Sequence, residues 1–227
     1  EWDLPASMGS TRAAMSDKLT SAAENTGNCA CMGLDPVIST LPAGLGFGEA
    51  AVGSGDAAGE TERSLVAFFR TLFGRMREEK LTPAAFKPNI GFFHVLDRPL
   101  EGDFQGSRAL AKVFAMLREY FPRIPLILDA KRGDIAGSSK NYAEEAFTCW
   151  KADAVTVHPF MGDDSVEPFL EKASQIGATV YILNRTSNKG AKRFQNLQTG
   201  AYGREEDRSG FYRAGGSEDE RIEGGRP

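Results

Sequence analysis

Length, composition and charge limit what this sequence can be. The chain has 227 residues, 41% hydrophobic and 26% charged, which suits one large folded domain or two small ones. Its net charge of −4 gives no general attraction to nucleic acid or to an anionic membrane surface, so neither partner is expected. No apolar run approaches the roughly 18 residues of a membrane span, and the first residues, EWDLPASMGSTRAAM, lack the apolar core of a secretory signal.

The first part of the chain alternates helical and strand patterns. Residues 9–26 are predicted to form a helix, and NCACMGLDP (28–36) a short buried strand that ends at an Asp-Pro break. Residues 43–60, rich in Gly and Ala, are expected to form a mobile surface loop. Apolar residues at helical spacing in 61–80 predict a helix with a core-facing stripe. The stripe consists of Leu65, Phe68, Phe69, Leu72 and Met76.

The same alternation continues to the end of the apolar sequence. AAFKPN (84–89) is predicted to be a strand that stops at Pro88. Predicted helices then cover 106–120, 137–149 and 164–175, and predicted strands cover 125–131, 154–158 and 178–184. Short apolar strands separated by helices predict right-handed βαβ units and a parallel sheet that is buried on both faces. Two architectures fit, an open doubly wound sheet and an eight-stranded βα barrel.

Polar residues at the carboxyl ends of the predicted strands favour the barrel. In a barrel these ends meet at one mouth, where catalytic residues are found, and no GxGxxG motif follows the first strand. The residues concerned are Asp35, Lys87, Asp129, Lys131, His158 and Ser187. The predicted fold class is therefore α/β, a TIM-type (β/α)8 barrel over residues 1–198 with its last strands absent from this chain. Residues 199–227, charged and Gly-rich, are predicted to be a disordered insertion or tail.

Cysteines and histidines give little sign of metal or redox chemistry. Cys29 and Cys31 share one face of a predicted strand, and Cys149 lies in a predicted helix. An odd number of cysteines without CxxC spacing predicts reduced thiols that serve in packing, and hence a cytoplasmic protein. His94 and His158 are the only histidines, and both are expected to serve in packing or hydrogen bonding rather than in a zinc site.

A cluster of charges is expected around the strand that contains LILDAKRGD. Asp129 and Lys131 lie two apart and share a face of the strand, and the turn that follows brings Asp134 near the next helix. Lys87, at the end of an earlier strand, can point into the same mouth. Charges of alternating sign would stabilise one another there. The alternative is that Asp134 only caps the helix and that Asp129 and Lys131 form a simple ion pair at the strand end.

Five sequence stretches together resemble the orotidine 5′-monophosphate decarboxylase family, in the branch common in many bacteria and some protozoa. They are GLDP (33–36), FKPNIGFF (86–93), DAKRGDI (129–135), VHPFMGDDSVEPFL (157–170) and RTSNKGAKRFQNL (185–197). The resemblance covers about residues 16–198. It implies a cofactor-free, cytoplasmic, homodimeric enzyme that converts orotidine 5′-monophosphate to UMP, the last step of de novo pyrimidine synthesis.

The resemblance also implies the catalytic residues. Lys87, Asp129, Lys131 and Asp134 match the family's Lys-Asp-Lys-Asp array, with Asp134 supplied across the dimer interface to the neighbouring site. Lys131 matches the proton donor to C6 of the pyrimidine.

Four further positions match substrate-binding residues of the family. Asp35 matches the acid that binds the ribose, and Ser187 the residue that hydrogen-bonds the pyrimidine ring. Ile135 and Ser138 match positions that reach the partner's substrate, with Ser138 where Thr is usual.

The chain departs from the family where the substrate phosphate is bound. The family uses a Gly-rich segment and an Arg after its last two strands, and residues 199–227 match neither. Two interpretations stay open, a barrel completed by a second polypeptide and a truncated chain that binds substrate weakly. Two rival functions also remain, a metal-dependent sugar-phosphate decarboxylase of the same barrel group and a catalytically silent barrel fragment.

Overall fold

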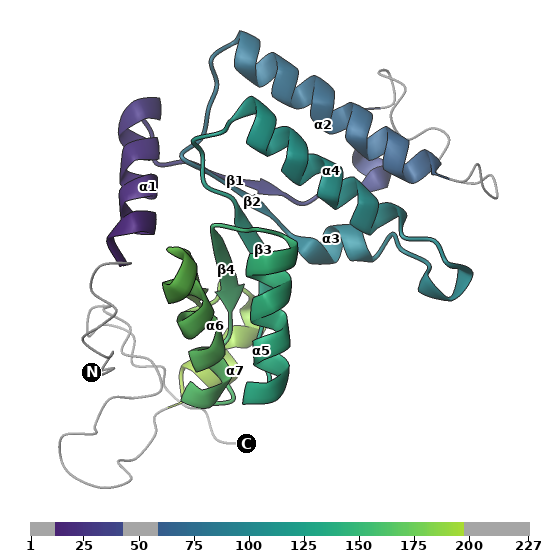
Figure 1. Cartoon of the computed structure of the whole chain (residues 1–227). Helices are drawn as coiled ribbons and strands as arrows, with labels where there is room; N and C mark the ends of the chain where they lie inside the picture. Colours follow the sequence, from purple (N-terminus) through teal and green to yellow (C-terminus); the bar gives the residue numbers. More distant parts are fainter. Residues whose placement is uncertain (1–11, 43–58, 198–227) are drawn as a thin grey trace, which may run out of the picture. The chain divides into compact units, whose positions relative to one another are not determined.

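A computed structural model of the chain describes residues 12–42 and 59–197 (Figure 1). The described residues divide into two units, with the division between Ile182 and Leu183. The helices of the first unit are α1 (Arg12–Thr26), α2 (Glu60–Glu78), α3 (Ile90–His94), α4 (Gln105–Tyr120), α5 (Ala136–Glu144) and α6 (Asp163–Ile176). Its strands are β1 (Cys31–Leu34), β2 (Ala85–Pro88), β3 (Ile127–Arg132), β4 (Ala154–Val157) and β5 (Thr179–Ile182).

The strands of the first unit pair in parallel and in chain order. β1 pairs with β2, and β3, β4 and β5 form a three-stranded sheet. Two parallel bridges connect these sheets, Phe86 with Leu126 and Asn89 with Asp129. Consecutive parallel strands joined by helices are the arrangement of βα units that the sequence predicted.

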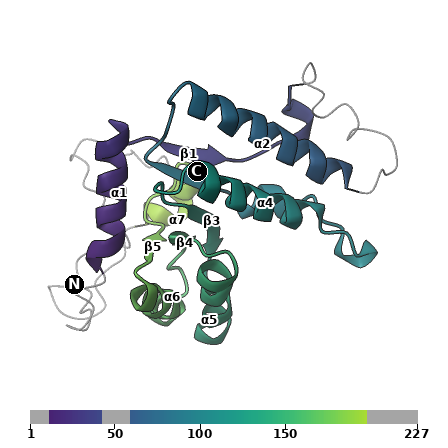
Figure 2. The same ribbon diagram turned by 45° about the horizontal axis from the view of Figure 1, so that its top comes forward.

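Helices pack on one face of the strands. α2 lies beside α4, and α5 beside α6, in both views (Figures 1 and 2). Between helices and strands, aromatic rings form a continuous chain, with centroids 5.5 Å apart for Phe69–Phe73, 5.9 Å for Phe73–Phe86 and 5.0 Å for Phe86–Phe121. Leu65, Phe69 and Met76 of the predicted stripe are buried, and Phe68 and Leu72 are half-buried. The stripe is therefore confirmed, although Phe73 also belongs to it.

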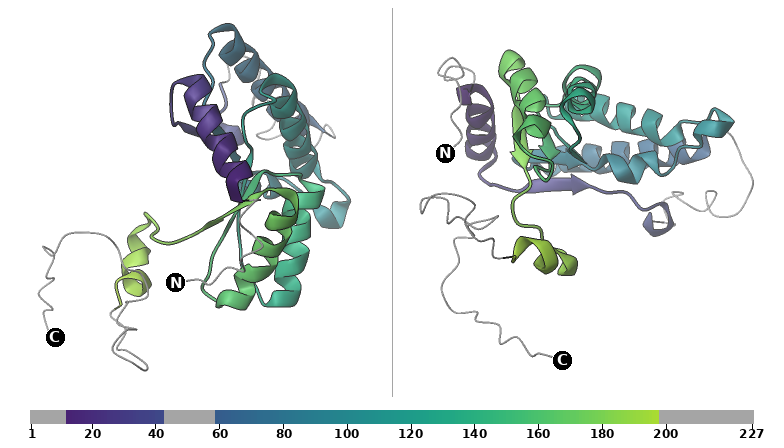
Figure 3. Two further views of the ribbon diagram at one scale, coloured as in Figure 1. Left: turned by 60° about the vertical axis from the view of Figure 1, so that its left-hand side comes forward. Right: turned by 90° about the horizontal axis from the view of Figure 1, so that it is seen from below.

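On the opposite face, helix α1 contacts the amino ends of the strands (Figure 3). Leu19 packs against Ala85, Ile127 and Ala154, the first residues of β2, β3 and β4. An ion pair of 3.1 Å between Lys18 Nζ and Asp153 Oδ1 adds to this contact. Because Ala85, Ile127 and Ala154 share a face with residues two positions further along, that face also carries Lys87, Asp129 and Thr156.

Most predicted elements are present, with shorter strands and some differences. The predicted strand over 28–36 covers only Cys31–Leu34, and the predicted helix over 137–149 ends at Glu144 and continues as a π-helical turn over Glu145–Cys149. Helix α3 was not predicted, because Pro88 was interpreted only as a strand end. Its first turn is capped by the Asn89 side chain, which accepts a hydrogen bond of 3.1 Å from Gly91 N. The predictions for residues 9–11, 43–58 and 199–227 lie outside the described residues.

The cysteines do not serve in packing as predicted. Cys29, Cys31 and Cys149 are free thiols, and all three are exposed. His158 fits its predicted packing role, because its ring lies so close to Gly133 that a Cβ at residue 133 would lie 2.5 Å from the ring. In residues 12–42 and 59–197, no three His, Cys, Asp or Glu side chains gather as metal ligands could. Nor is any helix in these ranges long and apolar enough to cross a membrane.

A buried carboxylate connects helices α2 and α4, and its neutralisation should destabilise the fold. Glu62 is 8% exposed. Its Oε2 accepts a hydrogen bond of 2.6 Å from Arg108 Nε, and its Oε1 lies 2.6 Å from Lys112 Nζ. Burial alone would raise the pKa of Glu62, but its hydrogen bonds with Lys112 and Arg108 lower the pKa overall. We expect Glu62→Gln to lower the free energy of unfolding at neutral pH by about 1–3 kcal/mol, measured by urea denaturation.

The matched control is Glu78→Gln, on the same helix. Glu78 pairs with Arg75 at 3.0 Å, but its side chain is 64% exposed, so a loss of at most about 0.5 kcal/mol is expected. Because the pKa of Glu62 is lowered by folding, the stability that it contributes is present above about pH 4.3 and is lost as the pH falls through the folded-state pKa. An equal effect of both substitutions, or an effect of Glu62→Gln that grows in acid, would contradict this assignment.

Candidate active site

The site is built around an irregularity in strand β3. Leu128 pairs with Val155 and Arg132 with Val157, so Asp129, Ala130 and Lys131 together face the single residue Thr156. Lys131 has a φ of 47° within this stretch, in the left-handed region that L-residues disfavour. The backbone is therefore unusual at the lysine for which the family resemblance implies the role of proton donor.

Two lysines and a carboxylate meet at this irregularity. Lys87 Nζ lies 2.5 Å from Asp129 Oδ2, and Lys131 Nζ lies 2.5 Å from Asp129 Oδ1. Thr156 Oγ1 donates a hydrogen bond of 2.9 Å to Asp129 Oδ1. The Asp129 side chain is 4% exposed, whereas that of Lys131 is 50% exposed. The carboxylate is thus the buried centre of the cluster, and Lys131 extends from it toward solvent.

The electrostatics keep Lys87 and Asp129 ionised at neutral pH. Burial alone would raise the pKa of Asp129, but hydrogen bonds from Lys131, Lys87 and Thr156 lower the pKa overall. Burial alone would lower the pKa of Lys87, but the hydrogen bond and the charge of Asp129, with a further contribution from Asp35, raise it overall. Lys87 and Asp129 therefore stabilise each other's charged forms.

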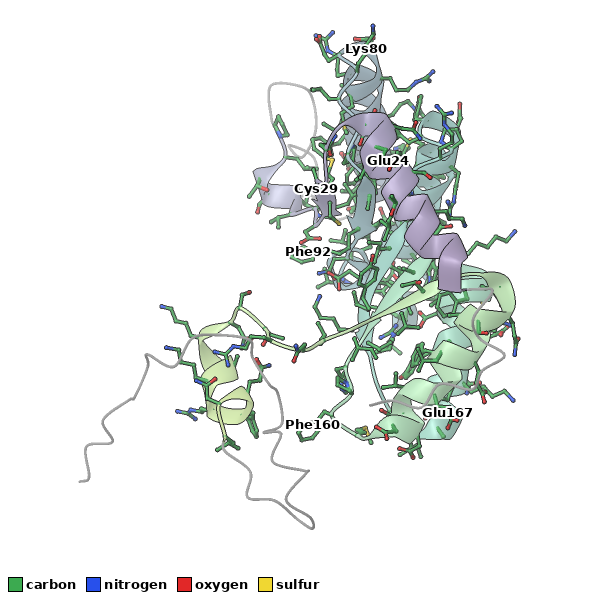
Figure 4. All side chains as sticks on the ribbon, turned by 90° about the vertical axis from the view of Figure 1, so that its left-hand side faces the viewer. Glu24, Cys29, Lys80, Phe92, Phe160 and Glu167 are labelled. Atoms are coloured by element: carbon green, nitrogen blue, oxygen red, sulfur yellow. The ribbon has the colours of Figure 1, made fainter. Side chains whose placement is uncertain are left out.

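A largely apolar cavity adjoins the cluster. Its volume is about 510 Å³, and its walls come from strands β1 to β5 and from α1. Lys87 and Thr156 of the cluster line it, together with Cys31 and Tyr181. Cys29, which lies between the end of α1 and the start of β1, lines it too (Figure 4). Burial raises the pKa of the Tyr181 phenol and, despite the opposing charge of Lys87, that of the Cys31 thiol.

The remaining predicted residues of the first unit follow the carboxyl ends of β1 and β3, on loops or on the first turn of α5. Asp35 follows β1 and is exposed. Its negative charge contributes to the raised pKa of Lys87. Ile135 is 61% exposed, and Ser138 is half-buried on the first turn of α5. Asp134 precedes α5, and its Oδ1 accepts a hydrogen bond of 2.7 Å from Ile135 N. The roles of Asp35, Asp134, Ile135 and Ser138 toward substrate stay predictions.

The alternative interpretation of DAKRGD differs from the structure at the ion pair of Asp129 and Lys131. The residue at the N-cap of α5 is Ile135, whose side chain makes no capping hydrogen bond, while the Asp134 carboxylate accepts a hydrogen bond from Ile135 N. Asp129 and Lys131 do form an ion pair, but the same carboxylate also holds Lys87 and Thr156. The described chain thus brings together three of the four charged residues, Lys87, Asp129 and Lys131.

Ser187 belongs to the second unit, in which residues 183–197 are described. This segment contains one short α-helix, α7 (Lys192–Gln195), which follows a 3-10 turn over Lys189–Ala191. Thr186 N donates a hydrogen bond of 2.9 Å to Gln195 Oε1, which closes the loop around Ser187 onto the helix. Ser187 is exposed, and its contact with a pyrimidine ring stays a prediction.

Sequence reasoning missed Thr156 and Tyr181. The signal was present, because AVTVH places Ala154, Thr156 and His158 on one face at a spacing of two, as Asp129 and Lys131 are on the neighbouring strand. Because Thr156 lies between Val155 and Val157, it was interpreted only as part of a buried strand.

Comparison with known proteins found a matching family and similar sequences. The profile of the Orotidine 5′-phosphate decarboxylase / HUMPS family matches residues 80–209, a range that includes Lys87, Asp129 and Lys131. The orotidine 5′-phosphate decarboxylase of Janthinobacterium sp. (strain Marseille) is 36% identical over 181 residues, which are 80% of this chain and 57% of that protein. That of Herpetosiphon aurantiacus is 36% identical over 180 residues, 79% of this chain and 57% of that protein.

Solved structures of an OMP decarboxylase and a UMP synthase are also similar to this chain. The Leishmania donovani OMP decarboxylase is 31% identical, with a TM-score of 0.57 over 82% of this chain and 60% of that one. The UMP synthase of the same organism is 32% identical, with a TM-score of 0.58 over 81% of this chain and 33% of that one. The chain therefore spans somewhat more than half the length of the curated relatives cited here.

Proposed function

Since this chain belongs to the Orotidine 5′-phosphate decarboxylase / HUMPS family, we propose that it decarboxylates orotidine 5′-monophosphate to UMP. The family membership confirms the predicted resemblance. It also confirms the predicted fold class, because the family has the TIM-type barrel and β1–β5 are consecutive parallel βα units of such a barrel.

The observation that carries the proposal is the cluster of Lys87, Asp129 and Lys131. Decarboxylation breaks the bond between C6 and the carboxylate, releases CO₂ and leaves the electron pair on C6. Without a cofactor to delocalise that pair, fixed positive charge must stabilise it. Two ammonium groups within 2.5 Å of one buried carboxylate supply positive charge that is already oriented.

Lys131 is the proposed proton donor. Its ammonium transfers one proton to C6, which completes UMP, and the neutral amine then takes a proton from solvent. The half-exposed side chain of Lys131 permits this exchange with water. Asp129 would lie near the departing carboxylate, while the Asp35 and Ser187 side chains would bind the ribose and the pyrimidine ring.

We further propose a cytoplasmic homodimer with shared active sites. Asp134, Ile135 and Ser138 would then reach the substrate of the partner subunit. Apolar side chains on the loops after β3 and β4 support such an interface, since Ile135 is 61% exposed and Phe160, labelled in Figure 4, is 67% exposed.

The function is tested by incubating the full chain with orotidine 5′-monophosphate and following the fall in absorbance as the pyrimidine loses its carboxylate. We expect turnover that survives EDTA. Loss of turnover with EDTA would favour the metal-dependent sugar-phosphate decarboxylase instead. Calorimetric titration with 6-azaUMP addresses the silent fragment, because such a fragment would show neither turnover nor saturable binding.

A further inference from the structure

We propose that Thr156 is the positioning residue that holds Lys131 and Asp129 in their reactive arrangement. This inference rests on the proposed decarboxylation and concerns a residue that touches neither the substrate carboxylate nor C6 in that mechanism. The observation that carries it is the mismatch between β3 and β4, where three residues of β3 face Thr156 alone.

The hydroxyl of Thr156 replaces the hydrogen bonds that regular pairing would supply. Its Oγ1 accepts from Ala130 N at 3.1 Å and from Lys131 N at 3.0 Å, and it donates to Asp129 Oδ1 at 2.9 Å. A threonine hydroxyl offers one donor and two acceptor positions, so these three bonds use its full capacity. The residue is buried, 8% exposed.

The backbone of Lys131 gives this contact its importance. Among the described residues, Lys80, Lys131 and Lys151 are the non-glycine residues with positive φ. Lys80 and Lys151 follow helical segments, where the left-handed conformation commonly ends a helix. Lys131 instead lies inside a strand, where this conformation costs about 1–3 kcal/mol and must be held by its surroundings.

The same hydroxyl also orients the carboxylate. Asp129 Oδ1 accepts hydrogen bonds from both Thr156 Oγ1 and Lys131 Nζ. Thr156 therefore fixes the position of the oxygen that binds the ammonium of Lys131. The Thr156 side chain thus positions both the backbone of Lys131 and, through Asp129, its ammonium group. Loss of the hydroxyl should therefore displace the proton donor without removing any charge.

The test compares Thr156→Val, which keeps the shape and removes the hydroxyl, with Thr156→Ser, which keeps the hydroxyl. Thr179→Val, on β5, removes a threonine hydroxyl outside the cluster and serves as the control. In the full chain, Thr156→Val is expected to accelerate hydrogen exchange at the amides of Ala130 and Lys131 and to lower kcat, each by about 10- to 100-fold, with KM nearly unchanged. Thr156→Ser should recover most of both losses, and Thr179→Val should cause neither.

Three results would overturn the inference. One is unchanged exchange at residues 130 and 131 in Thr156→Val, and another is a KM that rises as much as kcat falls. The third is an equal loss in Thr156→Ser, which would assign the effect to the methyl group. If the unsubstituted chain shows no turnover, the proposed function fails, and the exchange measurement alone decides whether Thr156 positions Lys131.

Discussion

Replacement of Lys131 by Ala should lower the rate of orotidine 5′-monophosphate decarboxylation by more than about 1,000-fold, because both the proton donor and a stabilising charge are lost. The fold should survive. The Lys131 side chain is 50% exposed, and Asp129 keeps its contacts with Lys87 and Thr156. Alanine and lysine bear the same strain at a φ of 47°, so the substitution leaves the backbone cost unchanged.

Lys151→Ala is the matched control for this experiment. Lys151 also has a positive φ, 52°, and is exposed, but it lies after the helical turn that ends at Cys149. Lys151→Ala therefore also replaces a lysine by alanine at a positive φ and removes one positive charge, but it leaves the cluster unchanged. Initial rates and thermal unfolding would be measured for both variants. Retained turnover in Lys131→Ala, or equal losses in both variants, would refute the role given to Lys131.

The order of the elements could be predicted from the sequence because each strand is a short apolar run and each helix carries a stripe. AVTV became β4 with all four residues buried, as expected for a strand covered on both faces. The strand ends were less predictable. Cys31 looked like a buried position, yet it is exposed and lines a cavity, because burial of that face depends on which side chains stand opposite it.

The charge cluster was predictable for a different reason. Asp129 and Lys131 share a face at a spacing of two, and the bridge between Asn89 and Asp129 brings β2 beside β3, so that Lys87 arrives at the same carboxylate. No spacing rule reveals the register shift between β3 and β4 or the left-handed backbone of Lys131. Both arise from pairing with a distant residue, Thr156, and this is why its role emerged only from the structure.

Replacement of Asp129 by Asn should remove the feature on which the cluster depends, the negative charge between two ammonium groups. Asp129 is 4% exposed and ionised, with a pKa lowered overall by its hydrogen bonds despite burial. A neutral amide cannot balance Lys87 and Lys131, and loss of one member of a buried charged pair costs about 3–5 kcal/mol. We expect Asp129→Asn to lower the free energy of unfolding by about 3 kcal/mol at pH 7, measured by urea denaturation.

The pH dependence of this loss has a definite sign. Because the pKa of Asp129 is lower in the folded state, its contribution to stability is present above the unfolded-state value of about 3.9. That contribution is lost as the pH falls through the folded-state pKa. Wild type and Asp129→Asn should therefore differ most at neutral pH and converge in acid. The pKa of Lys87, which Asp129 raises, should fall in the variant.

Kinetics of the same variant separate two roles of the carboxylate. Without Asp129 the ammonium of Lys131 loses its 2.5 Å anchor, so kcat should fall by about 100- to 10,000-fold. KM should stay constant or fall, because the amide no longer repels the carboxylate of the substrate. Asn141→Asp, on α5, is a control that changes a side chain of the same size outside the cluster. A rise in KM that accounts for the whole loss would instead make Asp129 a residue for binding substrate, and the proposed arrangement of charges around C6 would be wrong.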